Sequence, residues 1–105
     1  MDSQKNQYKV IISEKAADLL KQHVFFLSKV SEEAANKLRE EIISAIKSLE
    51  VLPERNPWLI NPFLPAYKYR KMLISNRYLI LYQVKAEFIY IDVIVDCRQD
   101  YHWLI

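Results

Sequence analysis

The sequence contains no glycine among its 105 residues. Turns that need a positive φ therefore have to use asparagine, aspartate or another residue that carries a side chain. The single cysteine, Cys97, excludes an internal disulfide, and no signal peptide is apparent, so we expect a cytoplasmic protein. No apolar run approaches the roughly 18 residues that a membrane-spanning helix requires, so we expect no membrane partner.

Metal ligands are equally scarce. Besides Cys97 there are two histidines, His23 and His102, which lie far apart in the sequence. Zinc sites need a cluster of such ligands at short spacings. The sequence therefore predicts neither a metal site nor a cofactor.

Acidic residues are absent from one long stretch, which runs from Arg55 to Ala86. The basic residues in that stretch are Arg55, Lys68, Arg70, Lys71, Arg77 and Lys85. A surface with charges of one sign focuses its potential and suits a polyanionic partner. A solvated basic surface that binds nothing would have the same composition.

The residues that are present predict one α+β domain that covers residues 1–105. Residues 8–12 are β-branched and short, which is typical of a strand. Ser13 and Ser31 precede two segments with helical spacing of apolar residues, so each serine is expected to cap a helix. Because almost no loop separates the two segments, they should form an antiparallel hairpin that ends before Pro53.

Three strands should follow a proline-rich connection over residues 53–65. They are expected at about residues 67–74, 78–84 and 88–95, joined by hairpin loops at 75–76 and 85–87. The order β-α-α-β-β-β indicates a two-layer fold in which the helical hairpin packs on one face of a four-stranded sheet.

Strand alternation assigns side chains to the two faces of this sheet. The apolar positions of the last strand are expected to face the helices: Ile89, Ile91, Val93 and Val95. The open face is then expected to gather four cations from neighbouring strands: Lys68, Arg70, Arg77 and Arg98. Lys71 breaks the alternation of its strand, so we expect it near an edge or a bulge.

Such cations could bind the phosphates of RNA, and nearby aromatic rings could stack on its bases. Metal-independent RNA cleavage needs a base for the 2′-hydroxyl, cations for the phosphorane and an acid for the leaving oxygen. Tyr101 and His102 follow Arg98 closely and could supply the acid. Alternatively, Arg98 pairs with a neighbouring aspartate, and Tyr101 and His102 anchor the end of the chain.

The segments "YRKMLISNRYLILYQV" (Tyr69–Val84) and "IYIDVIVDCRQD" (Ile89–Asp100) resemble the RelE/ParE superfamily of toxins from bacterial type II toxin–antitoxin modules. The resemblance spans about residues 8–101 and implies a sheet order of 1-4-3-2, mostly antiparallel. It also implies an antitoxin protein that wraps around the toxin. RelE-like members cut mRNA on the ribosome, whereas ParE-like members inhibit DNA gyrase and need no nuclease site.

The resemblance carries over to some residues and not to others. Arg70 and Arg98 match basic positions of RelE-like nucleases, whereas Met72 stands where many have a lysine. Leu79 replaces an arginine, for which Arg77 could substitute.

The sequence therefore predicts a ribosome-dependent mRNA endonuclease that needs no metal. Its expected catalytic residues are Arg98, Tyr101, His102 and Arg77, and its expected RNA-binding residues are Lys68, Arg70 and Lys71. The alternatives are a gyrase inhibitor and a former toxin that only binds its antitoxin.

Overall fold

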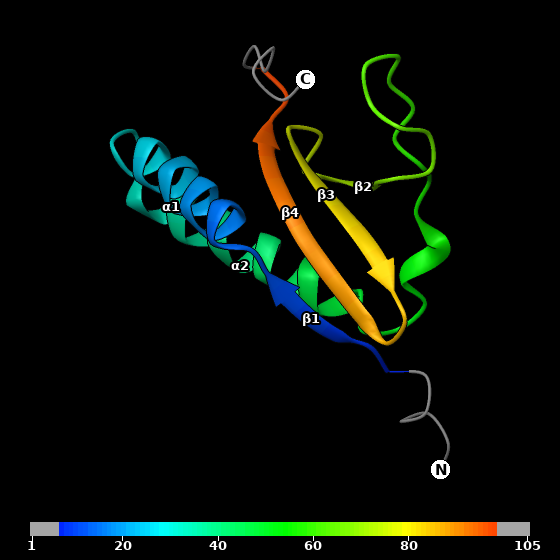
Figure 1. Cartoon of the computed structure of the whole chain (residues 1–105). Helices are drawn as coiled ribbons and strands as arrows, with labels where there is room; N and C mark the ends of the chain where they lie inside the picture. Colours follow the sequence, from blue (N-terminus) through cyan, green and yellow to red (C-terminus); the bar gives the residue numbers. More distant parts are fainter. Residues whose placement is uncertain (1–6, 99–105) are drawn as a thin grey trace.

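The computed structural model describes residues 7–98. Two helices, α1 and α2, lie against one face of a sheet of four strands (Figure 1). The helices and strands are β1 (Lys9–Ile12), α1 (Glu14–Ser28), α2 (Glu32–Ser48), β2 (Arg70–Ile74), β3 (Tyr78–Lys85) and β4 (Phe88–Asp96), with a short 3-10 helix at Pro53–Arg55. No helix of the described residues is long and apolar enough to cross a membrane.

Both helices begin where the sequence predicted. The Ser13 hydroxyl accepts a hydrogen bond from the Ala16 amide at 2.9 Å, and the Ser31 hydroxyl accepts one from the Ala34 amide at 3.1 Å. Each serine thus satisfies an amide that the first turn of its helix leaves unpaired. The helical residues that form the core are Ala16, Leu19, Leu38, Ile42 and Ile46.

The sheet has the order β1-β4-β3-β2. β1 runs parallel to β4, and the other two pairings are antiparallel. The predicted α+β class, the helical hairpin on one face and the mostly antiparallel sheet are all confirmed. This order makes β3 and β4 the central strands, which explains why both are apolar on both faces.

A β-bulge in β4 changes the expected faces. Leu81 pairs with Val93 and Tyr82 pairs with Ile91, so Asp92 is an extra residue without a partner on β3. Such an extra residue shifts the alternation of the strand that carries it. Asp92 interrupts an otherwise apolar run of β4, and alternation counted along the sequence passes over the extra residue.

The bulge reverses the face of the residues that follow it. Tyr78 packs against His23 of α1 at a ring separation of 5.4 Å, which identifies the helix-facing side of the sheet. Residues paired across strands share a face, so Ile94 lies on this side, and Val93 and Val95 lie on the other. The prediction that Val93 and Val95 face the helices is therefore wrong, although both are buried.

The turns manage without glycine. Ser75 and Asn76 adopt φ values of 54° and 55° in the β2–β3 hairpin, and Ala86 adopts 56° in the β3–β4 hairpin. Ile74 pairs with Tyr78, so the β2–β3 loop has three residues, and its two left-handed residues suit the twist of the flanking strands. A left-handed conformation costs a residue with a side chain about 1–2 kcal/mol, which the flanking strands must offset.

The connection between α2 and β2 is longer than predicted, because β2 begins at Arg70 rather than near Tyr67. Tyr67 has a φ of 60°, which no strand residue adopts. The connection rises beyond the sheet and returns to β2 (Figure 1).

Candidate functional site

Two of the predicted catalytic arginines meet at the end of the sheet. Arg77 precedes β3 and donates hydrogen bonds from Nε and Nη2 to the Asp96 carboxylate, at 3.2 and 2.9 Å. The Arg98 amide donates to the same carboxylate at 3.0 Å, and its guanidinium lies 3.7 Å away. The Asp96 side chain is 5% exposed, while that of Arg98 is 66% exposed. Asp96 thus holds both arginines at one place.

The Asp96 carboxylate is ionised in this arrangement. Burial alone would raise its pKa, but the hydrogen bonds from Arg77 and the Arg98 amide and the charges of both arginines outweigh burial. The pKa of Asp96 therefore lies below its ordinary value. The Arg77 guanidinium is correspondingly held charged, and both of its hydrogen bonds to the carboxylate are already made.

Arg70 lies elsewhere, which corrects the expected cluster of four cations. It pairs with Tyr82 across the sheet and therefore lies on the helix-facing side, as does the buried Met72. Because Tyr78 and Tyr82 are about 13 Å apart along the strand, Arg70 is well separated from Arg77. The prediction that Lys68, Arg70, Arg77 and Arg98 gather on the open face is wrong.

The Arg70 guanidinium is used within the fold. It donates to the backbone oxygens of Glu54 and Asn56, at 3.1 and 2.7 Å. It also stacks on the Trp58 ring at 3.9 Å. These contacts hold the connection against the edge strand β2.

Arg55 has a similar structural role at the end of α2. Its guanidinium donates to the backbone oxygens of Ser48, Val51 and Leu52 at 3.3, 2.8 and 3.0 Å. A cation at this position stabilises the carbonyl groups that the helix leaves unpaired. Arg55, Arg70 and Arg77, all from the acid-free stretch, are thus occupied by contacts within the protein.

The lysines are more accessible. Lys68 is exposed, with its ammonium 5.3 Å from the centre of the Tyr69 ring. Lys71 pairs with Leu81 and is half-buried on the open side of β2. Because β2 is an edge strand, the predicted edge position of Lys71 is confirmed.

The open face carries one polar cluster that sequence reasoning missed. The bulge presents Asp92, which accepts a hydrogen bond from Gln83 Nε2 at 2.6 Å. Burial raises the pKa of the Tyr69 phenol, and the charge of Asp92 and a hydrogen-bonding interaction with it raise that pKa further. A lone aspartate in an otherwise apolar strand was the signal that could have indicated a bulge.

Tyr101 and His102 lie outside the described residues, so their predicted roles stay predictions. Among residues 7–98, no group of histidine, cysteine, aspartate and glutamate residues could hold a metal ion.

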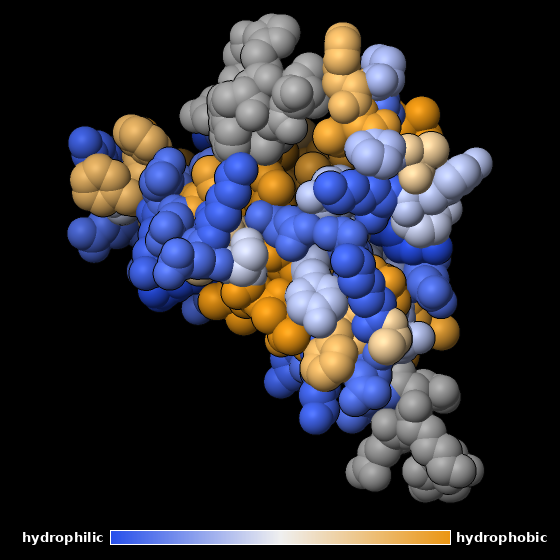
Figure 2. Space-filling model, in the orientation of Figure 1, coloured by the Kyte–Doolittle hydropathy of each residue, from blue (hydrophilic) through white to orange (hydrophobic). Residues whose placement is uncertain are grey.

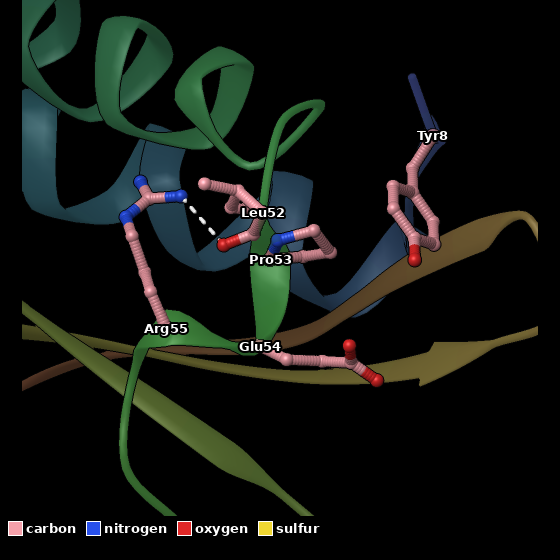
Figure 3. A pocket seen from close by; sticks show the side chains of 5 residues that line it. All are labelled: Tyr8, Leu52, Pro53, Glu54 and Arg55. Carbon is pink, nitrogen blue, oxygen red and sulfur yellow. Dashed lines mark hydrogen bonds between the residues drawn. The ribbon is translucent and has the colours of Figure 1, made fainter. Parts of the chain in front are cut away.

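A pocket of about 370 Å³ lies where β1 begins, beside the 3-10 helix (Figure 3). Its lining residues are Tyr8, Leu52, Pro53, Glu54 and Arg55. Arg55 is turned toward the backbone oxygen of Leu52 (Figure 3). The ionisable groups that line the pocket beside Arg55 are therefore the Glu54 carboxylate and the Tyr8 phenol.

Comparison with known protein families identifies the chain. Residues 10–101 match the family model for the ParE toxin of type II toxin–antitoxin systems, parDE. The chain belongs to the ParE toxin family. The predicted superfamily is therefore confirmed, and the chain is the toxin of a type II toxin–antitoxin module with a cognate antitoxin as its partner.

A solved structure supports the same fold. The chain is similar to a chain of the chromosomal ParDE toxin–antitoxin system from P. aeruginosa, with a TM-score of 0.70 and 17% sequence identity. The similarity covers 87% of this chain and 97% of that chain. A comparison with curated protein sequences finds no relative.

Proposed function

We propose that this ParE-family toxin acts in the cytoplasm by binding and inhibiting DNA gyrase, and that it does not cleave RNA. The family match favours this alternative over the nuclease, since ParE-like toxins need no nuclease site. The observation that carries the proposal is the state of the arginines. Arg77 is paired with Asp96, and Arg70 is bonded to backbone oxygens and stacked on Trp58.

A ribonuclease would need those guanidinium groups for its substrate. Donors that stabilise a transition state must point at the place where charge develops, and they must be available there. Arg77 would have to release a carboxylate, and Arg70 would have to leave its stacked position. Met72, at the position where many RelE-like nucleases have a lysine, is buried at 9% exposure and offers no base.

The mRNA endonuclease remains the second candidate, and one observation favours it. The Arg98 side chain is 66% exposed and close in sequence to Tyr101 and His102. Under that reading Arg98 contacts the reacting phosphate with Arg77 beside it, Tyr101 or His102 donates the proton, and Lys68, Arg70 and Lys71 bind the RNA.

The two functions separate in purified systems. We expect the wild-type toxin to inhibit DNA supercoiling by gyrase and to leave ribosome-bound mRNA intact. The double variant Tyr101→Phe/His102→Asn removes both proton donors with little change of shape, so it should inhibit gyrase as the wild type does. Cleaved mRNA with the wild type and intact mRNA with the variant would contradict the proposal and support the nuclease.

A further inference from the structure

The connection before β2 exposes large apolar side chains over residues 60–67, which we call the projecting loop. Ile60 is 71% exposed, and Phe63 and Tyr67 are each 69% exposed. In Figure 2 orange and pale surface covers the upper right of the molecule, where Figure 1 shows this connection. Scattered apolar residues are common on surfaces, but three large ones within eight residues of one loop indicate a contact surface.

The base of the projecting loop is held firmly to the sheet. The Leu59 amide donates to the backbone oxygen of Tyr69 at 2.7 Å, and the Lys71 amide donates to the backbone oxygen of Pro57 at 2.9 Å. The Trp58 ring stacks with the Arg70 guanidinium at 3.9 Å and meets the Tyr67 ring at a steep angle, with the ring centres 5.6 Å apart. These contacts fix both ends of the loop.

The loop itself is also restrained. Pro62 and Pro65 fix two φ angles within it. The Asn61 side-chain oxygen accepts a hydrogen bond from the Phe63 amide at 2.8 Å, and the Asn61 backbone oxygen accepts one from the Leu64 amide at 3.1 Å. A loop restrained in this way loses little entropy when it binds, so its apolar side chains can contribute most of their burial to affinity.

The charge around the loop selects the chemistry of a partner. No acidic residue occurs from Arg55 to Ala86, and Lys68 is exposed directly after the loop. Arg70 and Lys71 add positive charge at its base even though Arg70 is bonded internally. A complementary surface has an apolar pocket for Phe63 and Ile60 and acidic residues around that pocket.

We propose that the projecting loop is the surface by which this toxin binds its target protein. Ile60 and Phe63 enter an apolar pocket with an acidic rim on the target, and Lys68 contacts the rim. This inference rests on the proposed function, which makes gyrase the target. It assigns the contact to the loop and not to the predicted catalytic residues.

The test compares two double variants in the gyrase supercoiling assay. Ile60→Ser/Phe63→Ser removes the apolar tip of the loop. Phe25→Ser/Val30→Ser removes similarly exposed apolar side chains, at 57% and 83% exposure, from the tip of the helical hairpin. All four positions are exposed, so we expect both variants to unfold thermally close to the wild type. Antitoxin binding by each variant is measured in parallel.

We expect that half-inhibition of gyrase requires at least about a tenfold higher concentration of the loop variant than of the wild type, because such a loss is typical when a central contact of an interface is removed. The hairpin variant should inhibit as the wild type does, and both should bind the antitoxin. Equal inhibition by all three proteins would overturn the inference and leave the proposed function standing. Absence of inhibition by the wild type would overturn the proposed function as well. Loss of antitoxin binding by the loop variant with unchanged inhibition of gyrase would also overturn the inference, because the loop would then be an antitoxin contact and not a target contact.

Discussion

At the scale of single residues, Asp96 determines what the neighbouring arginines can do. One buried carboxylate accepts hydrogen bonds from the Arg77 side chain and the Arg98 amide. Replacing it by asparagine removes the charge and weakens these bonds. Because hydrogen bonds to charged groups contribute about 1.5–3 kcal/mol each, we expect Asp96→Asn to lower the free energy of unfolding by about 2 kcal/mol at pH 7. Urea unfolding measures this change.

The pH dependence gives the same prediction a second test. The pKa of Asp96 is lower in the folded protein than its ordinary value of 3.8. Its ionised form therefore stabilises the protein at pH values above 3.8, and this contribution is lost as the pH falls through the lower folded value. The difference between wild type and Asp96→Asn should shrink in this acidic range. Asp18→Asn on the exposed face of α1 serves as the control, and a difference that stayed constant with pH would contradict the assignment.

Tyr82 is the residue that joins the connection to the core. It is fully buried, its hydroxyl donates to the Pro53 oxygen, and it accepts a hydrogen bond from Asn56 at 3.0 Å. Tyr82→Phe leaves the buried Pro53 oxygen and the half-buried Asn56 amide without this partner, so it should lower the free energy of unfolding by about 1–3 kcal/mol. Tyr90→Phe, on the other face of the sheet and half-buried, is the control in the same denaturant experiment. An equal effect of both changes would show that the Tyr82 hydroxyl is not specifically required.

At the scale of helices and strands, local signals predicted most of the fold. Serine caps and apolar spacing located α1 and α2, and β-branched alternation located β3 and β4. Asp92 was the local sign of the bulge in β4, but the place of the bulge depends on how β4 pairs with β3 and not on the sequence of β4 alone. The start of β2 was misplaced for a similar reason. Hydrogen bonds with Pro57 and Leu59 order residues 69–71, and a pattern within the strand does not reveal such partners.

The candidate site was harder to predict than the fold. Alternation placed Arg70 and Met72 correctly on one side of β2, but the sequence did not show that this side faces the helices. Arg77 was chosen for its charge, and its partner Asp96 is nineteen positions away in the chain. Long-range pairing of this kind decides whether a cation is free to bind a ligand. Such pairing cannot be inferred from the composition of the sequence.

The turns provide a prediction at this same scale. Ala86 has a φ of 56°, where glycine avoids the steric cost of a side chain. Ala86→Gly should therefore raise the free energy of unfolding by up to about 1 kcal/mol, after the greater entropy of glycine in the unfolded chain is deducted. Ala17→Gly likewise replaces an alanine by glycine, but within α1, so it should lower the free energy of unfolding by about 1 kcal/mol. Changes of the same sign at both positions would contradict the left-handed conformation of Ala86.

At the scale of the whole molecule, charge is divided between the two halves of the chain. Four acidic residues belong to α2, namely Glu32, Glu33, Glu40 and Glu41, whereas the stretch from Arg55 to Ala86 has none. The net charge of +2 hides this separation. A partner with an acidic surface would be guided toward the basic half and its projecting loop, and guidance of this kind acts mainly on the association rate.

This separation predicts how binding of the target responds to salt. Lys68→Glu reverses one exposed charge beside the projecting loop, and Lys21→Glu makes the same change in net charge on α1. Because steering depends on where the charge lies, Lys68→Glu should lower the association rate with gyrase several-fold at low ionic strength, and Lys21→Glu should change it little. Above about 0.5 M salt the Debye length falls to a few ångströms, so the two variants should converge. Surface plasmon resonance at several salt concentrations measures both rates. Equal slowing by the two variants would mean that the net charge of the protein, and not the location of its basic residues, sets the association rate.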